Sequence, residues 1–145
     1  MTSVIFDIDG TLLESFRFDD EFYNSALRDV LGDVYIRDDW TTYNKITQTG
    51  VLREVLAENR LQDTNQFEKV RHRYGEYIQQ HIKGSDGWPP RPGAISLIQN
   101  LSATRDINIG IATGGWHHTA IMKLEAAGFT LNNIVLASSD DSDDR

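Results

Sequence analysis

The stretch that decides the fold stands near the N-terminus and reads Val4-Ile5-Phe6-Asp7-Ile8-Asp9-Gly10-Thr11. Its apolar start predicts a strand over 3–6 that is buried on both faces. Two carboxylates follow at once, and Gly10 opens a polar loop. Side chains two residues apart in an extended chain point the same way, so Asp7 and Asp9 are expected to converge on one spot beyond the strand.

That spot is a plausible place for chemistry, because α/β proteins bind ligands at the carboxyl ends of parallel strands. Two carboxylates suit Mg²⁺, which takes oxygen ligands and usually only one or two carboxylates. They equally suit a nucleophile beside a general acid. Gly10 lets the backbone turn close to a ligand, and the hydroxyl or amide of Thr11 can donate to an anion. A calcium loop is excluded, because its required glycine would fall on Leu12.

Helical periodicity fills residues 14–88 and predicts four helices. Asp19 is expected to cap the first and Gly32 to end it. The second is expected over 39–47 and the third over 51–59. Thr64 is expected to cap the fourth, which runs to Ile82. A dense run of turn formers at 84–90 then marks a boundary.

Beyond this boundary the pattern alternates between helices and strands. The expected elements are a helix from Pro92 to Ala103, a strand over 107–113, a helix over 117–127 stopped by Gly128, and a strand over 133–137. This order predicts an α/β fold with a parallel sheet. We therefore expect an α/β core built from 1–13 and 89–145, with a helical insertion over 14–88.

A second polar motif, Thr113-Gly114-Gly115, lies between the predicted strand and helix. A hydroxyl, two unobstructed amides and a helix N-terminus suit a phosphate-sized anion. The plain alternative is an ordinary strand-to-helix turn. The phosphate interpretation is favoured because Asp7 and Asp9 follow a neighbouring strand of the predicted sheet.

Composition narrows the class of protein. The chain has 145 residues, with 14 Lys and Arg against 22 Asp and Glu and a net charge of −8. The acidic balance disfavours nucleic-acid binding. The lack of cysteine excludes disulfides, thiolate metal sites and a cysteine nucleophile. No apolar stretch approaches the ~20 residues of a membrane helix, and Asp7 and Asp9 interrupt any signal peptide, so a cytoplasmic protein without a membrane partner is expected.

The motifs together resemble a known family. The stretch from Val4 to Leu12 resembles the first motif of the haloacid dehalogenase-like hydrolase superfamily. Pro92-Gly93 with Ile98 and Leu101, then Ile111-Ala112-Thr113-Gly114-Gly115, resembles its helix and second motif. Residues 14–88 resemble the family's α-helical cap, and the resemblance implies a Rossmann-like core.

The resemblance implies a Mg²⁺-dependent phosphatase acting on a small phosphorylated metabolite. Asp7 would attack the phosphorus and form an aspartyl-phosphate, and Asp9 would protonate the leaving group and later activate water. The Asp7 carboxylate and the Asp9 backbone carbonyl would hold Mg²⁺. Thr113 and the Gly114 amide would bind the phosphoryl oxygens. The paired acids favour a phosphatase or phosphomutase over a dehalogenase.

Two parts of the family pattern are less complete. The third motif is a Lys or Arg that neutralises the nucleophile; Arg145 is the better candidate by position and Lys123 the second. The acidic fourth motif is not found, and the chain resembles the first two thirds of such a hydrolase. The acidic run at 140–144 is expected to be a solvated tail, although Asp140 or Asp141 could complete the metal site.

Three alternatives stay open beside a phosphatase. A phosphomutase shares these motifs and differs in how the cap excludes water. A binding module would keep affinity for Mg²⁺ and phosphate without turnover. A partial chain would self-associate through a sheet edge left uncovered after the third strand.

Overall fold

The computed structural model describes residues 1–84 and 88–144 and contains a parallel sheet. Its strands, which lie side by side in chain order, are β1 (Thr2–Phe6), β2 (Ile107–Ala112) and β3 (Val135–Ala137). The register places Val4 opposite Ile109, so the loops that follow β1 and β2 leave the same edge of the sheet. The predicted α/β fold with a parallel sheet is confirmed.

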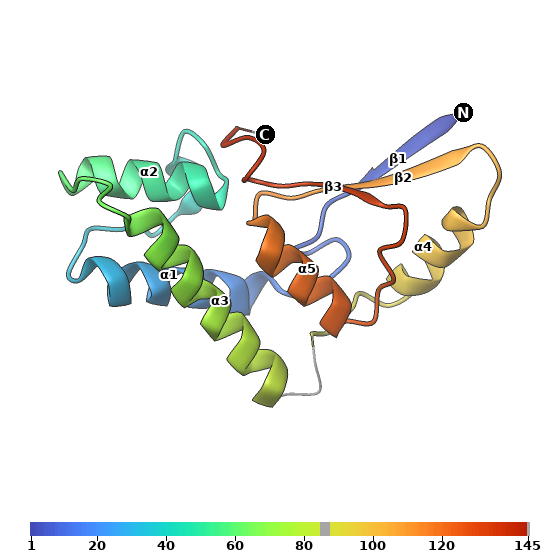
Figure 1. Ribbon diagram of the computed structural model, residues 1–145, viewed down its shortest axis with the longest axis horizontal. Coiled ribbons are helices and arrows are strands. Elements are labelled where there is room, and N and C mark those ends of the chain that lie inside the picture. The colour runs from blue at the N-terminus through green and yellow to red at the C-terminus, as the bar shows by residue number, and fades with distance from the viewer. Residues whose placement is uncertain (85–87, 145) are drawn as a thin grey trace.

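The helices form two groups around this sheet. They are α1 (Phe16–Leu31), α2 (Gln48–Glu58), α3 (Gln66–Gly84), α4 (Ala94–Ser102) and α5 (His117–Ala126). In Figure 1, α4 and α5 lie along one face of the strands, whereas α1, α2 and α3 gather beyond the ends of β1 and β2. Within the described ranges, no helix is long and apolar enough to span a bilayer.

The first strand is less buried than expected. Ile5 of β1 is 70% exposed, so the expectation that this strand is buried on both faces is wrong. Val135 of β3 is similarly exposed, at 75%. The reason is that α4 and α5 cover the same face of the sheet (Figure 1).

Local signals end two of the helices where predicted. Gly32 has a φ of +82°, and its N–H donates to the Arg28 carbonyl at 2.9 Å to close α1. Gly128, with a φ of +90°, follows the cap residue of α5, and its N–H donates to the Glu125 carbonyl at 3.0 Å. Such backbone angles are accessible to glycine at little steric cost.

Helix starts were predicted less well. Asp19 lies inside the first turn of α1 and not at its cap. For α3 it is Asp63 and not Thr64 that caps, since its Oδ1 accepts from the Gln66 amide at 3.0 Å and the Phe67 amide at 3.3 Å.

The prediction of a helix over 39–47 is wrong. Only a single 3-10 turn forms there, η1 (Trp40–Thr42). The Asp39 carboxylate accepts from the Thr41 amide and hydroxyl, and the Thr42 hydroxyl donates to the Asp39 carbonyl. These side-chain bonds to nearby backbone compete with helical hydrogen bonds and favour a turn.

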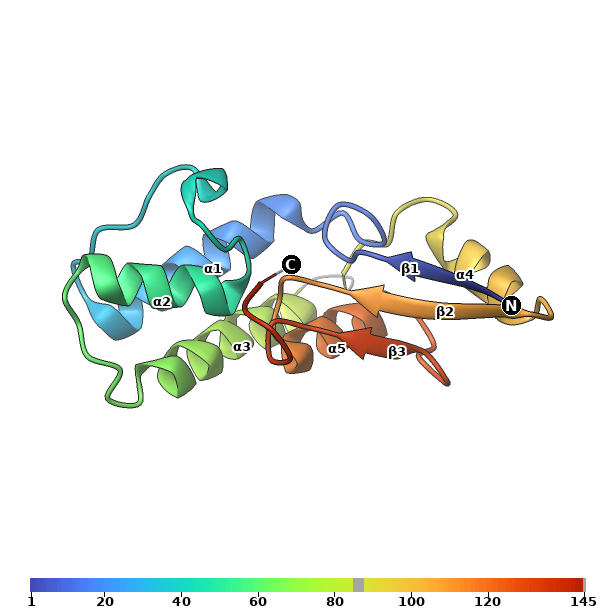
Figure 2. The same cartoon turned by 90° about the horizontal axis from the view of Figure 1, so that it is seen from above.

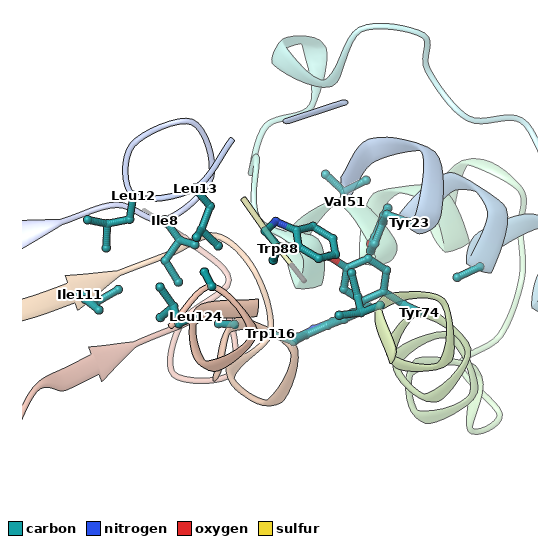
Figure 3. Packing of buried hydrophobic residues seen from close by; sticks show 14 of the residues in the cluster. Ile8, Leu12, Leu13, Tyr23, Val51, Tyr74, Trp88, Ile111, Trp116 and Leu124 are labelled. Atoms are coloured by element: carbon teal, nitrogen blue, oxygen red, sulfur yellow. The ribbon is translucent and has the colours of Figure 1, made fainter. Parts of the chain in front are cut away.

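One hydrophobic core joins the two groups of helices. Trp116, just before α5, is 1% exposed; its ring centroid lies 5.6 Å from that of Tyr23 in α1 and 5.8 Å from that of Tyr74 in α3. Figure 3 shows Trp116 between Leu124 on the sheet side and these tyrosines. Aromatic packing of this kind holds α1 and α3 against the carboxyl edge of the sheet.

Candidate active site

The two predicted motifs line one cavity. It measures about 280 Å³ and lies at the carboxyl ends of β1 and β2. Its lining from the strand ends is Asp7, Asp9, Thr113, Gly114 and Gly115. The other lining residues belong to the segment after β1 and are Asp19, Asp20, Trp40, Thr41, Ile46 and Gln48.

The loop after β1 is wound around one carbonyl. The Ile8 oxygen accepts from the amides of Thr11, Leu12 and Leu13 at 3.1, 2.9 and 3.0 Å. The Thr11 amide, expected as an anion donor, is therefore committed to the loop, while the Thr11 hydroxyl reaches the Asp7 carboxylate at 3.5 Å. Gly10 has a φ of +81° and turns the chain, but neither Gly10 nor Thr11 is among the described residues that line the cavity.

Most main-chain amides of the turn after β2 already donate hydrogen bonds to oxygens of the protein. The Gly115 N–H donates to the Thr113 hydroxyl at 3.1 Å, the Trp116 N–H to Gln48 Oε1 at 2.9 Å and the His117 N–H to the Asp140 carboxylate at 2.8 Å. The expectation of two unobstructed amides is thus wrong for Gly115. The N-terminus of α5 is capped from within the protein.

Lys123 is the predicted third-motif candidate that the structure brings to the site. Its ammonium, on α5, donates to Asp9 Oδ1 at 2.7 Å and to Asp19 Oδ1 at 2.8 Å. The side chain is only 2% exposed. It therefore pairs with Asp9 and not, as the family resemblance implies for the third motif, with Asp7. Arg145, the other candidate, lies outside the described residues.

The same oxygen of Asp9 has a second partner, because the Ser15 hydroxyl also donates to Oδ1. Ser15 is fully buried just before α1. Asp19 likewise accepts from the Tyr74 hydroxyl of α3. The carboxylates of Asp9 and Asp19 are thus held by groups from α3, from α5 and from the residue that precedes α1.

Negative charge dominates this cluster. Burial raises the pKa of Asp19, and the Asp9 carboxylate raises it further against the opposing charge of Lys123. Burial also raises the pKa of Asp20, helped by Asp19. Burial alone would lower the pKa of Lys123, but Asp19 and Asp9 outweigh it and raise that pKa. Burial is the largest cause of the two raised carboxyl pKa values, whereas the raised pKa of Lys123 follows from the two carboxylates bonded to it.

This excess charge bears on whether Mg²⁺ fits. In the described part of the chain, no three acidic or histidine side chains form a complete metal-binding group. Mg²⁺ usually takes one or two carboxylates and fills its shell with water and substrate phosphate oxygens. Asp7 at the cavity wall meets that requirement, and a divalent cation would offset the surplus carboxylates. The donor set therefore fits Mg²⁺ held jointly with a phosphate.

The acidic run at 140–144 is not the solvated tail expected. The Asp140 carboxylate pairs with Arg71 at 2.7 Å, and Asp143 pairs with Lys45 at 2.7 Å and with Arg53. Figure 2 shows this C-terminal segment folded back beside α2. Asp141 instead accepts from the nearby Ser138 amide at 2.8 Å. Asp140 and Asp143 thus join the C-terminal segment to α2, α3 and the loop before α2, and Asp141 holds its own turn.

Sequence reasoning missed the wall that comes from residues 14–88. Asp19 and Asp20 form an acidic pair that is visible in the sequence, but the helical pattern assigns Asp19 only a capping role. No sequence signal points to Gln48, Trp40 or Ile46, because their place at the cavity depends on how α2 packs against the turn after β2.

Comparisons with known proteins agree with this architecture. A family model described as haloacid dehalogenase-like hydrolase matches residues 1–144. No curated protein shows significant sequence similarity. A hydrolase from Pseudomonas syringae is 25% identical with a TM-score of 0.71, over 97% of this chain and 63% of that one.

Two further solved structures share the fold. CbbY from Rhodobacter sphaeroides, in complex with phosphate, is 18% identical with a TM-score of 0.68, over 97% of this chain and 64% of that one. A predicted phosphoglycolate phosphatase from Haemophilus somnus is 16% identical with a TM-score of 0.58, over 97% and 63%. The chain thus spans less than two thirds of the length of each of these three structures.

Proposed function

We propose that this chain, which belongs to the haloacid dehalogenase-like hydrolase family, is a Mg²⁺-dependent phosphatase that hydrolyses a small phosphorylated metabolite. The observation that carries the proposal is the meeting of Asp7, Asp9, Thr113 and Gly114 around one cavity at the carboxyl ends of β1 and β2.

The reaction would proceed in two steps. The Asp7 carboxylate attacks the phosphorus, an Asp7 oxygen–phosphorus bond forms and the bond to the leaving alcohol breaks, while Asp9 gives its proton to that alcohol. Asp9 then takes a proton from water, which attacks the aspartyl-phosphate and releases inorganic phosphate and free Asp7. Both acids line the cavity, as these roles require.

The transferring group needs stabilisation of its negative charge. Three of the four successive amides from Gly114 to His117 already donate to protein oxygens. We assign the remaining one, the Gly114 N–H, and the Thr113 hydroxyl to the phosphoryl oxygens. Mg²⁺, held by the Asp7 carboxylate and the Asp9 main-chain carbonyl, would supply further positive charge there.

Substrate choice is assigned to the insertion. We propose that 1–13 and 89–145 form the catalytic core and that 14–88 form the cap. Trp40, Ile46 and Gln48 of the insertion line the cavity together with the residues at the strand ends. A leaving group small enough for about 280 Å³, with an apolar surface, fits this wall.

The test is Mg²⁺-dependent phosphate release from a generic aryl phosphate by the wild type and Asp7→Asn. The wild type should turn over and Asp7→Asn should lose all measurable activity while keeping its circular dichroism spectrum. Asp33→Asn, an exposed site with the same charge change, is the control and should keep its rate. An Asp7→Asn variant that kept its rate would overturn the nucleophile assignment.

Two other outcomes identify the alternatives. Calorimetric binding of Mg²⁺ and inorganic phosphate without any turnover would make the chain a binding module. Isomerisation of a sugar phosphate, followed by ³¹P NMR, in place of phosphate release would make it a phosphomutase.

A further inference from the structure

The buried contacts behind the cavity form a chain that leads from α3 to Asp9. The Tyr74 hydroxyl donates to Asp19 Oδ1, Lys123 Nζ donates to that same oxygen at 2.8 Å, and Lys123 Nζ donates also to Asp9 Oδ1 at 2.7 Å. Tyr74 is fully buried, and the Lys123 side chain is 2% exposed. Asp19 and Tyr74 come from the helices of the insertion, whereas Lys123 and Asp9 belong to elements next to the sheet.

The geometry fixes how the Asp9 carboxylate is turned. Lys123 and Ser15 both donate to Oδ1, which leaves Oδ2 as the oxygen for a proton that moves to or from a substrate. The ammonium itself is placed by two carboxylates, so its position on Asp9 depends on Asp19. In a buried charge-assisted network of this kind, the loss of one partner weakens the hold on the others.

From these contacts we propose that Asp19, supported by Tyr74, is a positioning residue that acts through Lys123 to orient Asp9 for proton transfer. The inference rests on the proposed phosphatase function and deepens it, because it makes an insertion residue part of the acid–base machinery. Asp9 would be correctly turned only while α1 and α3 are packed against α5.

The chain offers a matched control on the same two helices. Asp29 of α1 accepts from the Tyr77 hydroxyl of α3 at 2.7 Å and from Arg73 Nε at 2.7 Å. This cluster repeats the carboxylate, tyrosine and cation of the Asp19 cluster, but it is partly exposed to solvent, and none of its members lines the cavity. Asp29→Asn and Tyr77→Phe therefore remove equivalent bonds without touching Asp9.

The experiment compares kcat and KM on two substrates that differ in leaving group. Nitrophenyl phosphate has a good leaving group and needs little help from an acid, whereas an alkyl phosphate depends on protonation of its oxygen. General acid catalysis is worth roughly 10² to 10⁴ in rate. In Asp19→Asn, kcat should fall about 100-fold on the alkyl phosphate and under about tenfold on nitrophenyl phosphate.

Tyr74→Phe is the gentler variant, because it removes one hydroxyl and leaves the core shape intact. It should shift the ratio of the two kcat values in the same direction by about threefold, with KM little changed, since it removes only one neutral hydrogen bond. Asp29→Asn and Tyr77→Phe should leave that ratio at the wild-type value. A purely structural role would lower both rates together and would leave the ratio unmoved.

A second measurement does not need turnover. The Lys123 ammonium, held by two carboxylates, should exchange slowly enough to give a ¹H–¹⁵N NMR signal that disappears or shifts in Asp19→Asn but not in Asp29→Asn. An unchanged signal, or an unchanged leaving-group ratio in an active protein, would overturn the positioning role alone. A wild type without phosphatase activity would overturn the proposed function and this inference with it.

Discussion

Gln48 Oε1 accepts a hydrogen bond from the Trp116 amide at 2.9 Å, across 68 residues of chain. The main-chain N–H of Gln48 in turn donates to the Gly114 carbonyl at 2.8 Å. One residue at the start of α2 thus binds both sides of the turn that follows β2. Gln48 thus connects the insertion directly to the proposed phosphate site.

Replacing Gln48 with alanine should destabilise the protein by about 1–3 kcal/mol, because the buried Trp116 amide loses its acceptor. Urea unfolding followed by tryptophan fluorescence measures the change. Gln79→Ala, on the exposed face of α3, is the control and should stay within about 0.5 kcal/mol of the wild type. A loss no larger than that of the control would mean that the contact between Gln48 and the turn contributes nothing.

Gly114→Ala should weaken phosphate binding about tenfold, or about 1.4 kcal/mol. A Cβ at this position would lie 3.3 Å from the Ile46 carbonyl oxygen and 3.5 Å from Thr47 Cα. The contact with the Ile46 oxygen is tight and involves a backbone atom, so the insertion and the turn must give way by a few tenths of an ångström, which displaces the amide assigned to phosphate. Calorimetric titration with inorganic phosphate and Mg²⁺ tests this, and an unchanged affinity would remove Gly114 from the site.

Replacing Gly75 with alanine should stabilise the protein. Gly75 lies inside α3, and a Cβ there would meet only Thr119 Cγ2 at 3.9 Å, an ordinary contact. Since alanine is favoured over glycine in a helix interior, Gly75→Ala should stabilise the protein by about 0.5–1 kcal/mol. Thermal unfolding would show a raised Tm, and a lowered Tm would reveal a clash between α3 and α5 that the structure does not contain.

Sequence patterns predicted the parts of this protein that depend on neighbours in the chain. The apolar run before Asp7, the glycines at 32 and 128 and the polar turn at Thr113 each act over a few residues. A parallel sheet then brings the ends of β1 and β2 together without further information. Fold class and the two motifs were therefore accessible from the sequence.

Contacts across the fold were not accessible in this way. Lys123 reaches Asp9 over 114 residues and Asp19 over 104, and a lysine in an amphipathic helix gives no sign of such a burial. The helix predicted from Asp39 is wrong for a different reason. Aspartate and threonine side chains there form hydrogen bonds with the nearby backbone in place of helical bonds. Tertiary packing and local side-chain bonds overrode periodicity in these two places.

The link between the C-terminal acids and the insertion should make stability depend on pH. The hydrogen bond from Lys45, together with the charges of Lys45 and Arg53, lowers the pKa of Asp143 below its ordinary 3.8. A carboxyl whose pKa is lower in the folded state stabilises the fold fully above its unfolded pKa, and this contribution is lost as the pH falls through the folded value. The free energy of unfolding of the wild type should therefore fall below about pH 4.

Asp143→Asn isolates this effect. The difference in unfolding free energy between wild type and Asp143→Asn should be constant near neutral pH and should shrink as the pH falls below 3.8. It should also shrink in 1 M NaCl, because Lys45 and Arg53 are partly exposed and salt screens such pairs. Asp33→Asn carries the same charge change at an exposed site and corrects for the overall loss of a carboxylate. A difference that stayed constant through acid pH would mean that the ion pairs of Asp143 do not hold the insertion to the C-terminal segment.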